Sequence, residues 1–185
     1  LKAKALNDIP GLNDGIGAEW GTNGDELMGR SDITNSTAPI QGGPPSIAAF
    51  DMENPIKITG FMHSPTHVVG DNTQLQMGMC VPDQNSTVTY NKYTDKVSLN
   101  WDRDANDASH QAILYSTQKM IETGGGKLQD ISAFGTWHPL GGAAMGTACD
   151  LNGKVYGVEN LYVIDGASIP GAAGAANPAL TVAAN

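Results

Sequence analysis

The chain has few basic residues and lacks any long apolar run. Of its 185 residues, 10 are Lys or Arg and 19 are Asp or Glu, which gives a formal net charge of −9 at pH 7. Nucleic acids and anionic membranes bind clusters of basic side chains, so we expect neither as a partner. A membrane-spanning helix needs about 20 consecutive apolar residues. No run of that kind occurs, and we therefore expect no membrane span.

Cysteines and metal-ligand patterns are also sparse. Cys80 and Cys149 are the two cysteines, and their spacing leaves both a disulfide and two buried thiols open. His63 and His67 are four residues apart, but Pro65 between them breaks a regular helix face and no third ligand is near in sequence. We therefore predict no metal site.

The glycine turn that binds dinucleotides is missing as well. Gly15, Gly17 and Gly21 are spaced as GxGxxxG, whereas that turn requires GxGxxG directly after a buried strand. We therefore expect that this chain alone does not bind a dinucleotide.

What the chain does contain is typical of a globular protein with strands and helices. Its hydrophobic content is 40% and its charged content 16%. Alternating apolar and polar residues predict strands with one buried face at Leu75 to Met79 and at Val97 to Trp101, and Ile56 to Met62 is a further strand candidate. Asp107 is suited to cap a helix over residues 108–123, which Gly124 to Gly126 would end.

The last fifty residues hold the most specific patterns. The continuous apolar run Leu161 to Ile164 predicts a strand buried on both faces of a parallel sheet, and Asp165-Gly166 follows it where such sheets present polar groups to ligands. The segment Ser168 to Asn177 is mostly Gly, Ala and Pro, so its backbone can approach a flat or bulky group closely. Pro178 suits the first turn of a final helix over residues 179–185.

Five segments together resemble one family in order and spacing. HPLGG (138–142), NLYVIDGASIPG (160–171) and NPALT (177–181) resemble the carboxyl-terminal motifs of the glucose-methanol-choline (GMC) family of flavin oxidoreductases. GAEWGTNGDELMGR (17–30) and KVSLNWDRDAND (96–107) resemble the cholesterol oxidase branch of that family. The resemblance is strong over 137–181 and loose over 34–90.

The resemblance implies an α/β protein, α+β in its overall arrangement, and the carboxyl-terminal part of a two-domain fold. Residues 1–18 would end a segment of the FAD domain, and residues 19–152 would form part of an antiparallel-sheet substrate domain with packed helices. Residues 153–185 would return into the Rossmann-like FAD-binding domain. Since the family's amino-terminal FAD fingerprint has no counterpart here, we expect the amino-terminal remainder of the same enzyme as a partner, joined to this chain or cleaved from it.

The resemblance also assigns roles to residues. It implies oxidation of an alcohol to a carbonyl by hydride transfer to FAD, with His138 as the base and Asn177 orienting the substrate oxygen. An imidazole titrates near neutral pH, and an amide holds an oxygen without competing for its proton. The cofactor contacts that it implies are Gly142, Asp165, Gly166, Asn177, Pro178 and Ala179.

The substrate class is less tightly constrained. The cholesterol oxidase branch predicts a bulky or sterol-like alcohol, with oxygen or another electron acceptor as the second substrate. However, the branch carries a buried glutamate where this chain has Ile58 to Met62, without a carboxylate, which puts sterol isomerisation in doubt. A family member that oxidises sugar or aryl alcohols and a non-catalytic flavin-binding remnant stay open as alternatives.

Two sequons bear on localisation. Asn35-Ser36-Thr37 and Asn85-Ser86-Thr87 match the N-glycosylation pattern, which predicts a secreted glycoprotein. Ser168 has no G-x-S-x-G context, so a hydrolase nucleophile is not expected there.

Overall fold

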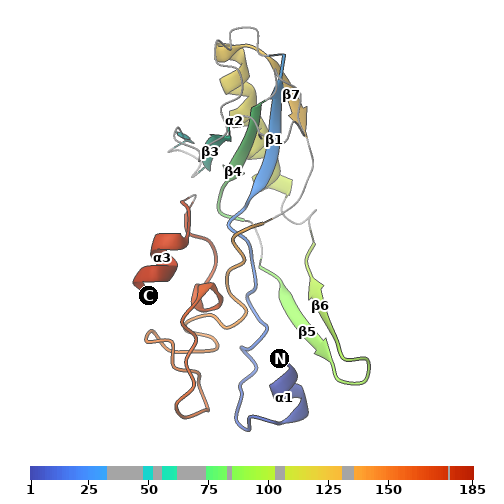
Figure 1. The fold of residues 1–185 in the computed structure, drawn as a ribbon, viewed down its shortest axis with the longest axis vertical. Coiled ribbons are helices and arrows are strands. Elements are labelled where there is room, and N and C mark those ends of the chain that lie inside the picture. Colours follow the sequence, from blue (N-terminus) through green and yellow to red (C-terminus); the bar gives the residue numbers. More distant parts are fainter. Residues whose placement is uncertain are drawn as a thin grey trace.

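The fold combines an antiparallel sheet, one long helix and an extended carboxyl-terminal region with little regular structure. The computed structural model describes residues 1–32, 48–51, 56–61, 74–82, 85–102, 107–130, 136–174 and 176–185. The sheet and its helix occupy one end of an elongated molecule, and the carboxyl-terminal region lies at the other end beside the amino terminus (Figure 1). His63, His67 and the sequon at Asn35 lie outside the described residues.

The sheet has five strands in the order β2-β3-β4-β1-β7, and every neighbouring pair is antiparallel. Its strands are β1 (Glu26–Ser31), β2 (Ala48–Asp51), β3 (Ile56–Phe61), β4 (Gln74–Met79) and β7 (Lys127–Asp130). Met77 and Met79 of β4 are buried, as the alternating pattern predicts. Gln76 is buried too, because β4 lies between β3 and β1 with residues covered on both of its faces.

Helix α2 (Asp107–Gly124) covers one face of this sheet (Figure 1). Ile113 is fully buried with Met28 of β1 in the main apolar cluster. A Cβ atom at Gly78 would lie 2.3 Å from Ile113 Cγ2, so only glycine lets the helix pack this closely. The helix ends at the predicted place because Gly125 has a φ of 73° and donates its N–H to Ile121 O.

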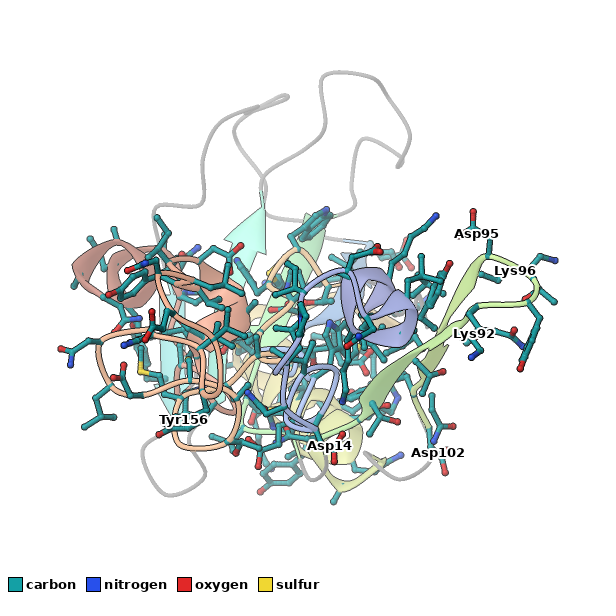
Figure 2. The ribbon with its side chains drawn as sticks, turned by 90° about the horizontal axis from the view of Figure 1, so that it is seen from below. Asp14, Lys92, Asp95, Lys96, Asp102 and Tyr156 are labelled. Atoms are coloured by element: carbon teal, nitrogen blue, oxygen red, sulfur yellow. The ribbon has the colours of Figure 1, made fainter. Side chains whose placement is uncertain are left out.

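Strands β5 (Thr87–Asn91) and β6 (Lys96–Asn100) form a separate hairpin. The predicted buried face of β6 is wrong, because Val97 and Leu99 are 65% and 45% exposed. The hairpin lies apart from the five-stranded sheet, so no second layer covers β6 among the described residues. Figure 2 shows Lys92, Asp95 and Lys96 around its turn.

Helix α1 (Lys2–Leu6) lies against this hairpin through a surface network. Lys2 Nζ is 2.8 Å from Asp95 Oδ1, and the Tyr90 hydroxyl donates to the same oxygen at 2.6 Å. The network joins the amino terminus to the hairpin turn.

The carboxyl-terminal region is held by loop hydrogen bonds and short helical turns, η2 (Gly166–Ser168) and α3 (Ala179–Ala184). The predicted strand Leu161 to Ile164 is wrong: Tyr162 makes an isolated bridge to Lys154, and Ile164 is 81% exposed. A strand requires a partner along its length, and in the described part of the chain only residues 153–155 pair with this run. The buried side chains of this region include instead those of Leu140, Cys149 and Val155.

Cys80 and Cys149 are both buried and form no disulfide, which settles the alternative left open by the sequence. Among the described residues, no helix is long and apolar enough to span a membrane.

Candidate functional site

His138 contacts a buried carboxylate. Its side chain is 16% exposed, and its Nδ1 lies 2.9 Å from Asp25 Oδ1 and 3.1 Å from Asp25 Oδ2. The Asp25 side chain is 0% exposed. Because a carboxylate only accepts hydrogen bonds, Nδ1 must carry the proton, and in the neutral ring Nε2 then keeps its lone pair.

Thr136 completes this contact. Its hydroxyl donates to Asp25 Oδ2 and accepts the backbone N–H of His138 at 2.9 Å. Thr136, His138 and Asp25 therefore form a closed set in which the hydroxyl fixes both the carboxylate and the start of the histidine loop.

Asn177 faces the other ring nitrogen. Its Oδ1 accepts the N–H of Ala179 at 2.9 Å, at the start of α3, which fixes the direction of the amide. The amide nitrogen Nδ2 then lies 3.5 Å from His138 Nε2. An amide donor and, in this tautomer, an imidazole lone pair thus stand side by side.

This arrangement suits a hydroxyl group. With its two nitrogens 3.5 Å apart, an oxygen can lie within about 3 Å of both, as hydrogen bonding requires. The oxygen would accept from Asn177 Nδ2, and its proton would point at the His138 Nε2 lone pair.

Asn23 holds the loop that leads to Asn177. Its side chain is fully buried, its Nδ2 donates to Ala176 O at 2.7 Å, and its Oδ1 accepts the N–H of Ala173 at 2.9 Å. The next residue, Gly24, has a φ of 63°, and a Cβ there would lie 2.5 Å from Cys80 O. The turn after Asn23 therefore requires glycine.

A pocket of about 460 Å³ lies beside the histidine loop. Its wall combines larger side chains with residues that have little or no side chain: Leu1, Trp20, Val88, Pro139 and Asp165 belong to the first kind, and Gly17, Gly141, Gly142, Gly166 and Ala167 to the second. The volume falls in the range of small-molecule sites. Asp165 is exposed, and its Oδ1 accepts the N–H of Ala167, so it also caps the η2 turn.

Comparison with known protein families identifies the family to which this region is similar. The family model described as GMC oxidoreductase matches residues 82–185, more than half of the chain. The chain belongs to the GMC oxidoreductase family. The matched residues include β5, β6, α2, His138, the pocket wall from Pro139 to Ala167, and Asn177. Membership supports a flavin-dependent oxidoreductase in a family that typically binds FAD.

The pocket is compatible with part of such a cofactor. Positive φ angles of 72° and 89° at Gly141 and Gly142 bring the backbone to the pocket surface without side chains. A planar ring can approach a wall of this kind closely. Gly142, Asp165 and Gly166, expected from the GMC resemblance, all line this pocket.

The sequence-based residues fall into two groups in the structure. His138 and Asn177 come together, whereas Pro178 and Ala179 belong to the start of α3: Pro178 is buried, and Ala179 contributes the N–H that orients Asn177. None of these four residues belongs to the wall of the pocket.

Sequence reasoning missed Asp25, Thr136 and Asn23. The one available sign was that an acid immediately before the strand Glu26–Ser31 lies within the segment resembling the cholesterol oxidase branch. Nothing local in the sequence links Asp25 to a histidine 113 residues away.

Proposed function

We propose that this chain carries the substrate-side catalytic groups of an FAD-dependent alcohol oxidase or dehydrogenase. The supporting observation is the His138 Nε2 lone pair 3.5 Å from the Asn177 amide donor. In the proposed reaction, His138 Nε2 takes the hydroxyl proton and Asn177 Nδ2 donates to the substrate oxygen.

With a flavin present, the proposed reaction accounts for the proton and for both electrons that the alcohol loses. A bound flavin would supply the acceptor for the hydride of the alcohol carbon, and loss of one proton and one hydride would leave a carbonyl. The proton stays on His138 as an imidazolium, whose Nδ1–H continues to donate to Asp25. Of this chain's residues, Gly142, Asp165 and Gly166 would hold the flavin.

The proposed substrate is a bulky, sterol-like alcohol. The support is the likeness of residues 17–30 and 96–107 to the cholesterol oxidase branch. The absence of a carboxylate from Ile58 to Met62 favours oxidation without isomerisation. A sugar or aryl alcohol as substrate, and a flavin protein without turnover, are the competing outcomes of the test below.

We further propose that the amino-terminal FAD-binding part of the same enzyme packs against the carboxyl-terminal region. Large apolar side chains there are uncovered: Trp137 is 65% exposed, Ile164 81% and Leu180 83%. A partner that covers these side chains would remove their apolar surface from water. The proposal keeps the domain boundaries after residues 18 and 152, with residues 19–152 in the substrate domain and the rest in the FAD domain.

Secretion with N-glycosylation belongs to the same proposal. Asn85 is exposed at the start of the β5 hairpin, where an oligosaccharide has room. Treating the native protein with an N-glycosidase and measuring the intact mass tests it; an unchanged mass would contradict it.

The decisive experiment is anaerobic reduction of the native protein by a panel of alcohols, followed by flavin absorbance. Bleaching by cholesterol in preference to glucose and benzyl alcohol is expected. Bleaching by a sugar or aryl alcohol alone would refute the sterol proposal. Bound flavin that no alcohol reduces would refute the proposed oxidation.

A further inference from the structure

His138 and Asn177 reach the site from two separate loops, and one buried segment contacts both. Asp25 binds the ring of His138, and Asn23 binds the backbone that precedes Asn177. Exposed fractions of 0% for Asn23 and 1% for Asp25 show that neither side chain is a surface group.

We propose that Asn23 and Asp25 are positioning residues for the alcohol oxidation. Asp25 fixes the His138 tautomer with the proton on Nδ1, and Asn23 fixes the backbone that places Asn177 Nδ2 beside His138 Nε2. The catalytic meaning of this inference rests on the proposed function, but the tautomer and the loop geometry are properties of the chain itself.

The Asp25 part follows from its partners. One carboxylate oxygen accepts from the Thr136 hydroxyl, and the carboxylate also faces His138 Nδ1 at 2.9 Å. Both donors require an acceptor, and a buried carboxylate without such donors would be costly. The ring is thereby held with Nε2 as the acceptor that removal of a hydroxyl proton needs.

This geometry predicts an unusual result for Asp25→Asn. The Thr136 hydroxyl already donates to the Oδ2 position, so the new amide places its oxygen there and its NH₂ group at the Oδ1 position. That NH₂ group stands at the nearer position, 2.9 Å from His138 Nδ1 against 3.1 Å for the position of the amide oxygen, so its N–H should donate to Nδ1 and displace the proton there. The substitution should move the proton to Nε2 while it keeps the size of the side chain.

The Asn23 part follows from its two bonds. They run to the N–H of Ala173 and to the carbonyl of Ala176, the residue before Asn177. Both polar ends of the amide are used, so its direction is fixed. A loop of small residues carries few side chains that could anchor it by packing, so these two bonds tie it to the buried segment that precedes β1.

The first test is the tautomer of His138 in the native protein labelled with ¹⁵N-histidine. The chain has 4 histidines, and loss of one set of resonances in His138→Gln assigns the relevant set. Wild type should show the Nδ1–H form, and Asp25→Asn the Nε2–H form. A wild-type Nε2–H form, or an unchanged tautomer in a folded Asp25→Asn protein, would overturn the Asp25 assignment.

A matched double variant tests the reason. In Asp25→Asn/Thr136→Val no hydroxyl holds the amide, so its oxygen can turn towards His138 Nδ1. The Nδ1–H form should reappear in part. If it does not, Thr136 is not what sets the direction of the amide, and this part of the proposal is wrong.

The second test separates the two bonds of Asn23 by hydrogen exchange of the Ala173 amide. Asn23→Asp keeps an acceptor for that amide and should retain its slow exchange, whereas Asn23→Ala should exchange faster. Both variants lose the donor to Ala176 O, and both should lower kcat by about 10-fold or more with little change in KM. Unchanged exchange and kcat in Asn23→Ala would overturn the Asn23 assignment.

Kinetics link the tautomer to the reaction. Asp25→Asn should lower kcat by about 100-fold or more while KM changes little, because the base is present in the wrong form. If wild type oxidises no alcohol, the proposed function fails while the tautomer experiment still decides the role of Asp25. If Asp25→Asn shifts the tautomer without lowering kcat, the positioning role fails while the function stands.

Discussion

Asn177 Oδ1 accepts the N–H of Ala179 at 2.9 Å, while Asn177 Nδ2 lies 3.5 Å from His138 Nε2. One side chain therefore both binds the N–H of the first residue of helix α3 and faces the histidine. The hydrogen bond from Ala179 fixes which way the Asn177 amide points, and the proposed catalytic role depends on Nδ2 pointing towards His138.

Asn177→Asp separates these two roles. The carboxylate still accepts from Ala179, so α3 should begin at the same place, but no donor remains for a substrate oxygen. We expect kcat for alcohol oxidation to fall by about 10-fold or more, as in Asn177→Ala. Steady-state kinetics check this, with Asn152→Ala as a control at an exposed asparagine. Full activity of Asn177→Asp would rule out the donor role.

His138→Gln removes the proposed base and keeps a neutral polar side chain. The rate of flavin reduction should fall by about 10² to 10⁴, the usual contribution of general base catalysis. Anaerobic stopped-flow absorbance measures this rate, and the flavin content of the purified variant serves as the control. A variant that holds flavin and is reduced at the wild-type rate would remove His138 from the mechanism.

Arg30→Ala should destabilise the protein. The Arg30 guanidinium donates to the carbonyls of Gly124, the last residue of α2, and of Gly125, which follows it; carbonyls at a helix end have no partner within the helix. We expect a loss of about 1 kcal/mol in the free energy of unfolding. Urea denaturation measures it. Arg30→Lys should retain part of the stability, because one ammonium reaches one carbonyl.

The network at the hairpin turn predicts a shift in the titration of Tyr90. Its hydrogen bond to Asp95 raises the pKa of the Tyr90 hydroxyl above its ordinary 10.0. Asp95→Asn should lower this pKa towards the ordinary value. Absorbance at alkaline pH measures it, with Tyr90→Phe identifying the contribution of this residue. The same midpoint in both proteins would contradict the network.

The same contacts act in the opposite sense on Asp95. The hydrogen bond from Lys2 lowers the pKa of the Asp95 carboxyl below its ordinary 3.8. Its contribution to stability is therefore present above that ordinary value and is lost as the pH falls through the lowered one. Because the groups are exposed, the effect should also fade in high salt.

Cys149 should be unreactive in the native protein. Burial, and then the neighbouring Asp150 carboxylate, raise the pKa of the Cys149 thiol above its ordinary 9.0. The stabilisation from the neutral thiol is complete below that ordinary pKa and is lost as the pH rises through the higher native value. Stability should therefore fall at alkaline pH in wild type and fall less in Cys149→Ser.

Thiol labelling checks the same point directly. Cys80 and Cys149 should react with a thiol reagent in denaturant and not in the native state at neutral pH. Rapid native labelling of Cys149→Ser at Cys80 would show that Cys80, not Cys149, is the accessible thiol and would contradict its burial.

The elements that the sequence predicts well carry their own end markers. Asp107 begins α2, and Gly125 and Gly126 with positive φ follow its last residue, so pattern and stop residues agree. Strand β3 likewise ends within one residue of the prediction. In such segments the information that sets the structure is local.

Leu161 to Ile164 shows the limit of that reasoning. An apolar run shows that its side chains are suited to burial, but whether a sheet forms depends on the presence of partner strands. Here the run pairs only with residues 153–155 in the described chain. The hydrophobic pattern of β6 misleads for the same reason, because it states which face is apolar and not what covers that face.

The site divides in the same way. Short motifs identify His138 and Asn177, each within a few residues of a proline that sets its loop. Asp25 is one of 19 acidic residues, and only the folded structure shows that it is the one beside the imidazole. Sequence reasoning finds groups marked by their neighbours along the chain, and it misses groups whose meaning comes from neighbours in space.

The contacts at Asp25 and Asn23 also bear on how the chain folds. Asp25 meets His138 across 113 residues, and Asn23 meets Ala176 across 153. Contacts of such high sequence separation require closure of a long loop and form slowly compared with a helix such as α2. The contact between Asp25 and His138 should therefore form late in refolding, after α2 has formed. Its presence then indicates that nearly the whole chain has reached its native arrangement.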